Sequence, residues 1–400
     1  MPTTDLPQLL ALLLWVPIVA IVHELGHALA ARPAGFRVTS FGIGRGRPIL
    51  RATLPGGVVF HIGWLFFTGG ACVAIPRSPE SGPRAALFHG GGIAAQVLLG
   101  ALLLVLPEGP STPWLEAGGQ FNLLVAAWNL LPWRMGRMAS DGWWLLSRLT
   151  SGAVAPRRAL FEQRDAIEKV LAYERRVGSP VGIWYGHRML AWCDLLADRV
   201  DSAHARLHDA APLPVPDPHL ERIDGLIRAE AWQRSGHPLV ALRTIETLRE
   251  APIPADDTAD LLVVVEARAW LALGDLHRAR QCVAQLAGVG GAIGREATSV
   301  FLAIATASED QPAVYTAATR LSKASTAGMF DPLSAARALA DAVPLAPDHN
   351  TAARWRARAV GIARAALQQA SPEDQPALQA ALTSLVEPPR EPRDAHAITP

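Results

Sequence analysis

The sequence predicts a mainly α-helical membrane protein. We expect a core of about three transmembrane helices with a small β-region, followed by a soluble, repeat-like helical domain. Up to about residue 150 the chain is rich in Leu, Val, Ala and Gly and has few acids. Beyond that point Arg, Asp and Glu become frequent and the apolar residues recur with helical periodicity. We therefore expect a membrane-embedded core at 1–150, a connecting helix at 151–180, a helical domain at 181–385 and a disordered tail at 386–400.

Composition excludes several classes of protein. The formal net charge is +1 and no Lys/Arg-rich block occurs, so we expect no nucleic-acid partner. Cys72, Cys193 and Cys282 are scattered and form no CxxC pair. They support neither a disulfide framework nor a cysteine zinc site, and we expect them to be small buried hydrophobic residues.

Three apolar runs are the candidate membrane spans. Leu6–Val22 is almost unbroken and continues in helical character to about Ala31, which is long enough to cross a bilayer. Ile93–Leu106, extended backwards to about Ala85, is the second. Phe121–Trp133 is the third, and it can span only if it begins several residues earlier or the bilayer is locally thin.

The basic residues predict the orientation. The loop after the second run carries Glu108 and Glu116 and no Lys or Arg, whereas arginines follow the first and third runs. By the positive-inside rule the N-terminus is outside and the C-terminal part is cytoplasmic. The arginines are Arg32, Arg37, Arg45, Arg47 and Arg51 after the first run, and Arg134, Arg137, Arg148, Arg157 and Arg158 after the third.

Residues 35–76, between the first two spans, are rich in β-branched and aromatic residues and are interrupted by Gly and Pro. This pattern predicts three or four short strands with tight turns, one of them at the PGG of residues 55–57. Unpaired strand edges are not tolerated in hydrocarbon, so we expect the strands near the cytoplasmic face.

The stretch VAIVHELGHALAAR, residues 19–32, places His23, Glu24 and His27 in an apolar helix. Positions i and i+4 share one helix face, so both imidazoles can bind a single zinc ion. Glu24 can then accept a proton from a water that the metal activates. The alternative is a pair of histidines that cap a membrane helix at its interface, where the intervening acid would gain nothing and would cost desolvation.

A catalytic zinc ion needs a third protein ligand. Asp141, in the segment WNLLPWRMGRMASDGWWLL, is the candidate. Pro132 would kink or end the preceding helix, and Gly142 permits a tight turn that lets the aspartate reach back. Taken alone, Asp141 could equally be the N-cap of a helix over Trp143–Leu149. Asn129 could cap a helix or hydrogen-bond a substrate backbone.

HELGH in a first transmembrane helix, followed by NLLP and then DG, resembles the site-2 protease family of intramembrane zinc metalloproteases over roughly residues 6–150. The resemblance implies Zn²⁺ held by His23, His27 and Asp141, with Glu24 catalytic. Asn129 and Pro132 match the family's Asn and Pro, and Asn129 would bind substrate. It further implies a membrane protein substrate in the lipid bilayer, a place in the bacterial plasma membrane, and a β-region that receives substrate as an added strand.

Three departures from that family pattern concern substrate positioning more than zinc binding. The interval from Pro132 to Asp141 is longer than the commonest form. Trp143 replaces the usual second glycine after Asp-Gly. In the second core helix, GGIAAQ has Ile93 and Gln96 where the family has Pro and Asn.

The C-terminal half contains four similar helix–turn–helix stretches. Their turns fall near Asp198, Gly236, Gly274 and Glu309, at spacings of 38, 38 and 35 residues. The pattern resembles degenerate tetratricopeptide repeats, and an irregular helical bundle is the alternative. Stacked helix pairs would offer a concave face to a peptide or protein partner.

Two functions are consistent with these patterns. The first is an intramembrane zinc metalloendopeptidase that cleaves a membrane-spanning or membrane-proximal peptide, with Glu24 as general base. The alternative is a catalytically inactive, membrane-anchored scaffold that binds protein partners through its helical repeats. A site closed by a fourth protein ligand would favour the scaffold.

Overall fold

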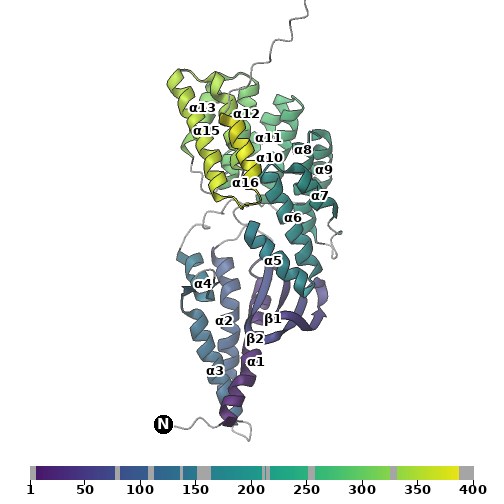
Figure 1. Cartoon of the computed structure of the whole chain (residues 1–400), viewed down its shortest axis with the longest axis vertical. Helices are drawn as coiled ribbons and strands as arrows, with labels where there is room; N and C mark the ends of the chain where they lie inside the picture. The colour runs from purple at the N-terminus through teal and green to yellow at the C-terminus, as the bar shows by residue number, and fades with distance from the viewer. Residues whose placement is uncertain are drawn as a thin grey trace, which may run out of the picture. The chain divides into compact units, whose positions relative to one another are not determined.

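The computed structural model describes residues 6–76, 82–106, 112–135, 138–150, 164–209, 212, 217–250, 257–324 and 331–386. Helices dominate, and Figure 1 shows their order along the chain. The chain divides into two compact units. Unit 1 comprises 1–156, 169–186 and 211–217, and unit 2 comprises 157–168, 187–210 and 218–400.

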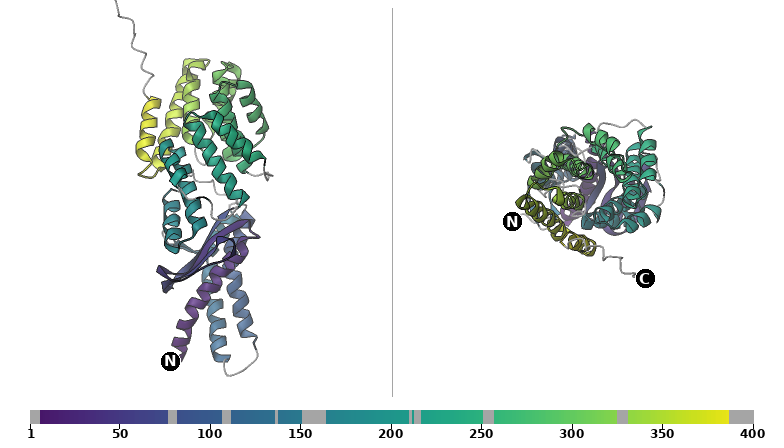
Figure 2. Two further views of the ribbon diagram at one scale, coloured as in Figure 1. Left: turned by 90° about the vertical axis from the view of Figure 1, so that its right-hand side faces the viewer. Right: turned by 90° about the horizontal axis from the view of Figure 1, so that it is seen from above.

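Unit 1 is built on three long helices, α1 (Leu6–Ala31), α2 (Gly82–Leu104) and α3 (Thr112–Leu130), which run side by side in Figures 1 and 2. Large apolar side chains such as Leu98 and Leu124 point outward, and Leu98 is 71% exposed. Among the described helices, α1 over Leu13–Ala31 and α2 over Pro83–Leu104 are long and apolar enough to cross a membrane. The third predicted span, Phe121–Trp133, does not meet that measure: it covers the end of α3 and three residues beyond it.

Glycines let α1 and α2 approach each other closely. A Cβ atom at Gly26 would lie 2.4 Å from the carbonyl oxygen of Gly91, and one at Gly91 would lie 2.6 Å from the carbonyl oxygen of Gly26. Small residues at a helix crossing allow two backbones to pack directly in a membrane. The glycine inside HELGH and the glycine run of α2 therefore fix the distance between the two helices.

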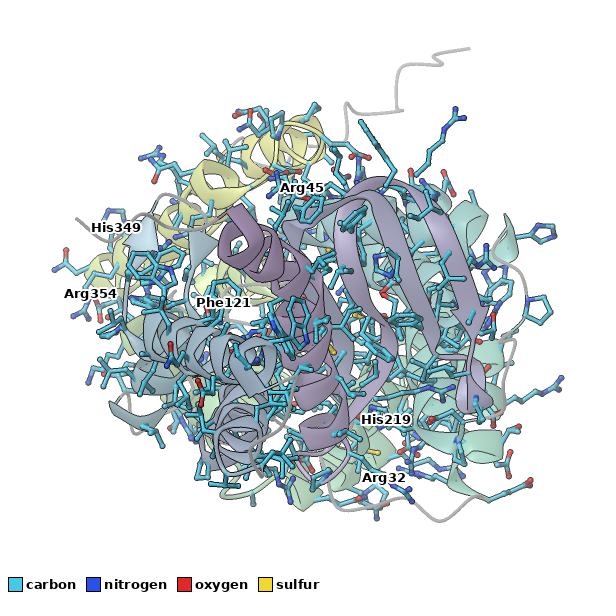
Figure 3. The ribbon with its side chains drawn as sticks, turned by 90° about the horizontal axis from the view of Figure 1, so that it is seen from below. Arg32, Arg45, Phe121, His219, His349 and Arg354 are labelled. Atoms are coloured by element: carbon cyan, nitrogen blue, oxygen red, sulfur yellow. The ribbon has the colours of Figure 1, made fainter. Side chains whose placement is uncertain are left out.

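The β-region consists of two long antiparallel strands, β1 (Phe36–Thr53) and β2 (Val59–Pro76), rather than three or four short ones. A 3₁₀ turn, Pro55–Gly57, joins them at the predicted PGG. The centre of β1 pairs on both sides, because Gly42 faces both His61 and Ala71. Each strand therefore takes two places in the sheet, which explains why four strand-like stretches can be counted in the sequence. Figure 3 shows the sheet beside α1.

Part of the chain after residue 168 packs on the sheet of unit 1. Helix α5 (Arg164–Val177) carries Glu174, which is fully buried, and its Oε1 accepts hydrogen bonds from Thr39 at 2.6 Å and Ser40 at 3.0 Å. Burial raises the pKa of Glu174, and hydrogen bonds from Thr39, Ser179 and Ser40 offset part of the rise. Arg37 of β1 also forms a buried ion pair with Asp217. These contacts tie β1 to segments remote in sequence.

Unit 2 is a series of antiparallel helix pairs, seen from above in Figure 2. Each of the first four pairs turns through a left-handed residue, at Asp198 (φ 63°), Gly236 (φ 78°), Gly274 (φ 78°) and Glu309 (φ 54°). These are the turn positions that the sequence alignment predicts. The helices are α6 (Pro180–Leu196), whose residues before His187 belong to unit 1, α7 (Val200–Asp209), α8 (Pro218–Arg234), α9 (Pro238–Arg249), α10 (Asp257–Ala272), α11 (Leu276–Gln285), α12 (Gly291–Ala307), α13 (Gln311–Lys323), α14 (Pro332–Ala342), α15 (His349–Gln369) and α16 (Gln375–Val386), with a 3₁₀ turn at Val343–Leu345.

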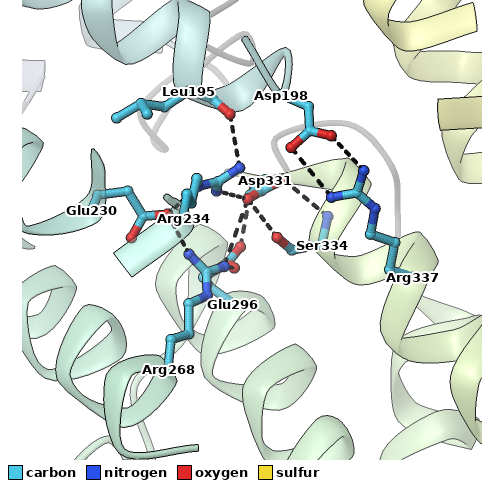
Figure 4. Close-up of polar contacts among 9 residues, drawn as sticks. All are labelled: Leu195, Asp198, Glu230, Arg234, Arg268, Glu296, Asp331, Ser334 and Arg337. Atoms are coloured by element: carbon cyan, nitrogen blue, oxygen red, sulfur yellow. Dashed lines mark hydrogen bonds and ion pairs between the residues drawn. The ribbon is translucent and has the colours of Figure 1, made fainter. Parts of the chain in front are cut away.

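A buried ionic cluster connects four helices of unit 2 (Figure 4). Arg234 and Arg268 both contact Glu230, at 2.6 and 2.8 Å, and they also pair with Asp331 and Glu296 respectively. All three carboxylates are buried. Because buried charges are stable only when paired, this cluster specifies how α8, α10, α12 and α14 meet.

Candidate metal centre

Helix α1 brings the two histidines of HELGH onto one face near its C-terminal end. The Nε2 atoms of His23 and His27 lie 3.1 Å apart, and the two rings are nearly perpendicular. His27 is buried and His23 is half-buried. The i, i+4 spacing of an α-helix produces this arrangement without help from the rest of the chain.

Asp141, the first residue of α4 (Asp141–Thr150), reaches both histidines. Its Oδ2 lies 2.9 Å from His23 Nε2 and 3.4 Å from His27 Nε2. Burial would raise the pKa of Asp141, but its contacts with His23, His27 and His89 hold that pKa well below its usual range. The carboxylate is aimed at the two imidazoles.

Ser140, rather than Asp141, caps α4. Its Oγ accepts hydrogen bonds from the backbone N–H groups of Trp143 at 3.1 Å and Trp133 at 3.2 Å, and donates to Leu131 O at 2.5 Å. A side-chain oxygen that accepts from the third helical N–H is the N-cap interaction. The N-cap alternative for Asp141 is therefore wrong, and its carboxylate is free to face the histidines.

The described residues of the long interval between Pro132 and Asp141 pair with one another. Strands β3 (Arg134–Met135) and β4 (Met138–Ala139) are antiparallel, and Ser140 N donates to Trp133 O at 3.1 Å. This pairing brings Ser140, just before the aspartate, next to Trp133, just after Pro132. Gly142 then packs against α3, where a Cβ atom would lie 1.9 Å from Leu130 O.

The three side chains fit a zinc ion. One ligand atom each from His23, His27 and Asp141 lies within 4.8 Å of the other two. In the described part of the chain, no other set of three or more His, Cys, Asp or Glu side chains is close enough together to hold one ion. Two imidazole nitrogens and one carboxylate oxygen are a donor set that suits zinc, and three protein ligands are typical of catalytic rather than structural zinc sites.

Helix α2 contacts all three of these side chains. His27 Nδ1 lies 2.8 Å from Phe88 O, and His23 Nδ1 lies 3.2 Å from Gln96 Oε1. His89 Nδ1 lies 3.8 Å from Asp141 Oδ1, and its ring stacks on Trp144. Asn129 also reaches this group, because its Nδ2 lies 3.4 Å from both Gln96 Oε1 and His23 Nδ1.

Glycines make room for the site on two sides. A Cβ atom at Gly92 of α2 would lie 2.6 Å from His27 Nε2 and 2.7 Å from His23 Cε1. A Cβ atom at Gly70 of β2 would lie 2.5 Å from Glu24 Oε1. Glu24, which is only 7% exposed, thus lies directly against the strand.

A family model agrees with this geometry. The model of peptidase family M50 matches residues 11–309, which is more than half of the 400-residue chain. The chain belongs to peptidase family M50. M50 peptidases, the site-2 protease family, are integral membrane metalloproteases. No curated protein and no solved structure matches the chain.

The M50 match confirms the family that the sequence motifs predict, and it extends beyond the expected range of about 6–150 into the helices of unit 2. No tetratricopeptide assignment accompanies it, so that likeness stays a prediction.

The structure places His23, Glu24, His27, Asp141 and Asn129, the residues singled out in the sequence, near one another, and it adds two further residues to the group. His89 was overlooked, and Gln96 was noted only as a departure from the family pattern. Their signal was available: two polar residues seven apart in an apolar helix share one face, and polar groups inside membrane segments are rarely accidental.

Proposed function

We propose that this M50 peptidase is an intramembrane zinc metalloendopeptidase that cleaves a membrane-spanning or membrane-proximal peptide. The observation that carries the proposal is the convergence of His23, His27 and Asp141 within 4.8 Å, beside the buried Glu24. We assign the three convergent side chains as zinc ligands and Glu24 as the general base.

A zinc ion bound by these side chains would lower the pKa of a water ligand and polarise the scissile carbonyl group. Glu24 accepts a proton from the attacking water and returns it to the leaving amine. Glu24 is only 7% exposed, so this transfer takes place in a medium of lower dielectric constant than bulk water. Asn129 donates a hydrogen bond to the substrate backbone.

The sheet supplies the place for the substrate strand. From Gly70 to Pro76, β2 pairs with β1 on one side, and no other described strand pairs with its second edge. Gly70, the first residue of this Gly70–Pro76 segment of β2, lies against Glu24. An extended peptide added to this edge would gain main-chain hydrogen bonds and pass next to the general base.

Two further assignments belong to the proposal. The arginines after α1 and α3 support a cytoplasmic site with the N-terminus outside. The helix pairs of unit 2 bind a peptide or protein partner, in keeping with their repeated turns at Asp198, Gly236, Gly274 and Glu309. The inactive scaffold finds no support in the site, because the metal group has no fourth member among the described residues.

The test compares Glu24→Gln with wild-type protein in liposomes that contain a library of tagged single-span membrane peptides. Mass spectrometry reports cleavage, and metal analysis reports zinc. We expect Glu24→Gln to retain zinc and lose cleavage, whereas Glu116→Gln, at an exposed position on α3, cleaves like wild type. Cleavage at the wild-type rate by Glu24→Gln would overturn the assigned mechanism.

A further inference from the structure

Gln96 is the most unusual residue of α2. The helix is apolar along most of its length, yet the Gln96 side chain is fully buried (0% exposed). Its amide nitrogen, Nε2, has no hydrogen-bond partner among the described residues. A buried donor without an acceptor destabilises a fold, and an apolar side chain of the same size would avoid that cost. The residue therefore needs an explanation other than packing.

The explanation lies at the other end of the amide. Gln96 Oε1 lies 3.2 Å from His23 Nδ1 and 3.4 Å from Asn129 Nδ2. An imidazole that binds a metal through Nε2 carries its proton on Nδ1 and donates it. His23 Nδ1 then donates to Gln96 Oε1. Asn129 Nδ2, which lies 3.4 Å from both atoms, donates to the same oxygen and not to the protonated Nδ1. Gln96 Oε1 thus accepts two hydrogen bonds, whereas Gln96 Nε2 has no acceptor among the described residues.

The second histidine repeats the arrangement with a backbone group. His27 Nδ1 lies 2.8 Å from Phe88 O, also on α2. Both Nε2 atoms face Asp141, and both Nδ1 atoms face an oxygen of one helix. Two independent contacts thus select the same tautomer, with the Nε2 lone pair directed at the centre of the group.

We propose that Gln96 is a positioning residue: it fixes the tautomer and ring orientation of His23 so that Nε2 can bind zinc. The inference rests on the proposed metal site and adds to it a residue that touches neither zinc nor substrate. Hydrogen bonds from metal-binding histidines to outer oxygens orient the ring and raise its basicity, and their loss weakens metal binding about 10–100-fold.

The experiment measures metal affinity in the full-length chain in detergent, by competition between the protein and a chromophoric chelator for Zn²⁺. The absorption spectrum of bound Co²⁺ reports ligand geometry. Gln96→Met keeps the size of the side chain and removes both polar atoms. Gln96→Glu keeps an acceptor for His23 Nδ1. Asn122→Leu is the matched control, because Asn122 is another fully buried amide of the helical core, bonded to Gly118 O in α3.

We expect Gln96→Met to weaken Zn²⁺ affinity about 10–100-fold and to alter the Co²⁺ spectrum. The thermal midpoint of its metal-free form does not decide the matter, because the substitution removes one orphaned donor but also takes the acceptor away from His23 Nδ1 and Asn129 Nδ2. Gln96→Glu should bind Zn²⁺ within a few-fold of wild type, and Asn122→Leu should bind like wild type. A purely structural Gln96 would instead leave the Zn²⁺ affinity and the Co²⁺ spectrum of Gln96→Met unchanged.

Wild-type affinity in Gln96→Met would overturn the inference. So would a loss of Zn²⁺ affinity of about 10-fold or more in Gln96→Glu, and this outcome decides the matter if the methionine variant does not fold. The experiment also distinguishes failure of this inference from failure of the proposed function. Wild-type protein that binds zinc but cleaves nothing refutes the peptidase assignment, while the affinities still decide the role of Gln96. Wild-type protein that binds no zinc refutes both.

Discussion

His23 Nε2 and Asp141 Oδ2 lie 2.9 Å apart, although α2, α3 and the whole β-region separate the two residues in the chain. The contact between α1 and α4 therefore depends on the fold, not on local sequence. The aspartate is placed by the Ser140 cap and by Gly142, which docks on the end of α3.

Replacement of Asp141 should remove one of three metal ligands. We expect wild-type protein to hold about one zinc per chain. Asp141→Ala should bind Zn²⁺ more than about 100-fold more weakly, since the loss of outer contacts alone costs 10–100-fold. Chelator competition on detergent-purified protein measures this, with Asp201→Ala, at an exposed position on α7, as the control. A Zn²⁺ affinity of Asp141→Ala equal to that of wild type would show that Asp141 is not a metal ligand.

Two neighbouring glycines of α2 make a matched pair. A Cβ atom at Gly92 would lie 2.6 Å from His27 Nε2, whereas one at Gly90 meets only Leu145 Cδ1, at 3.5 Å. Gly92→Ala should therefore push the imidazoles apart and weaken Zn²⁺ binding at least about 10-fold. Gly90→Ala should bind like wild type, because its methyl group makes an ordinary contact. Equal affinities in the two variants would contradict the close approach of α2.

His89 should have a smaller influence than Gln96. Its Nδ1 lies 3.8 Å from Asp141 Oδ1, which is an electrostatic contact rather than a direct hydrogen bond. His89→Phe keeps a ring that can stack on Trp144 and removes the polar nitrogen, so we expect Zn²⁺ affinity to fall by less than about 10-fold. His89→Asn, which places an amide nitrogen near the position of Nδ1, should restore part of the loss. A fall as large as that of Asp141→Ala would instead make His89 a ligand.

Local patterns predicted the parts of this protein that local physics determines. The spacing of His23 and His27 predicted that both lie on one helix face, and turn residues such as Gly236 and Gly274 predicted the turns of the helix pairs. Both follow from interactions within a few residues. The apolar lengths of α1 and α2 likewise predicted two helices that can span a bilayer.

Features that depend on contacts between distant segments could not be predicted in the same way. The doubled pairing of β1 was interpreted as extra short strands, because strand propensity does not reveal which strand pairs twice. The burial of Glu174 against Thr39 joins a helix and a strand whose contacting residues lie 135 positions apart in the chain. Asp141 as N-cap and Asp141 as metal neighbour were equally consistent with the sequence, and Ser140 decided between them.

The last prediction concerns the ionic cluster of unit 2. With every group ionised, it contains the three carboxylates of Glu230, Glu296 and Asp331 and the two guanidinium groups of Arg234 and Arg268, so one proton makes it neutral. Burial raises the pKa of Glu296 to about 7, because the Arg268 charge only partly offsets the desolvation and the neighbouring acids add to the rise. Of the three carboxyl groups, Glu296 is therefore the one that we expect to take up this proton as the pH falls through about 7.

The folded state then binds more protons than the unfolded state between the ordinary glutamate pKa of 4.5 and a pKa of about 7. The free energy of unfolding should fall as pH rises through that window. At about 1.4 kcal/mol for each unit of pKa shift, the change is on the order of 3 kcal/mol. Glu296→Gln, which resembles the protonated form, should remove most of this dependence. Hydrogen exchange in α12 and α14 of the full-length chain, corrected for the intrinsic pH dependence of exchange, measures it, with Glu246→Gln on the exposed face of α9 as control. A pH dependence that is the same in Glu296→Gln and wild type would place the proton on another carboxyl group.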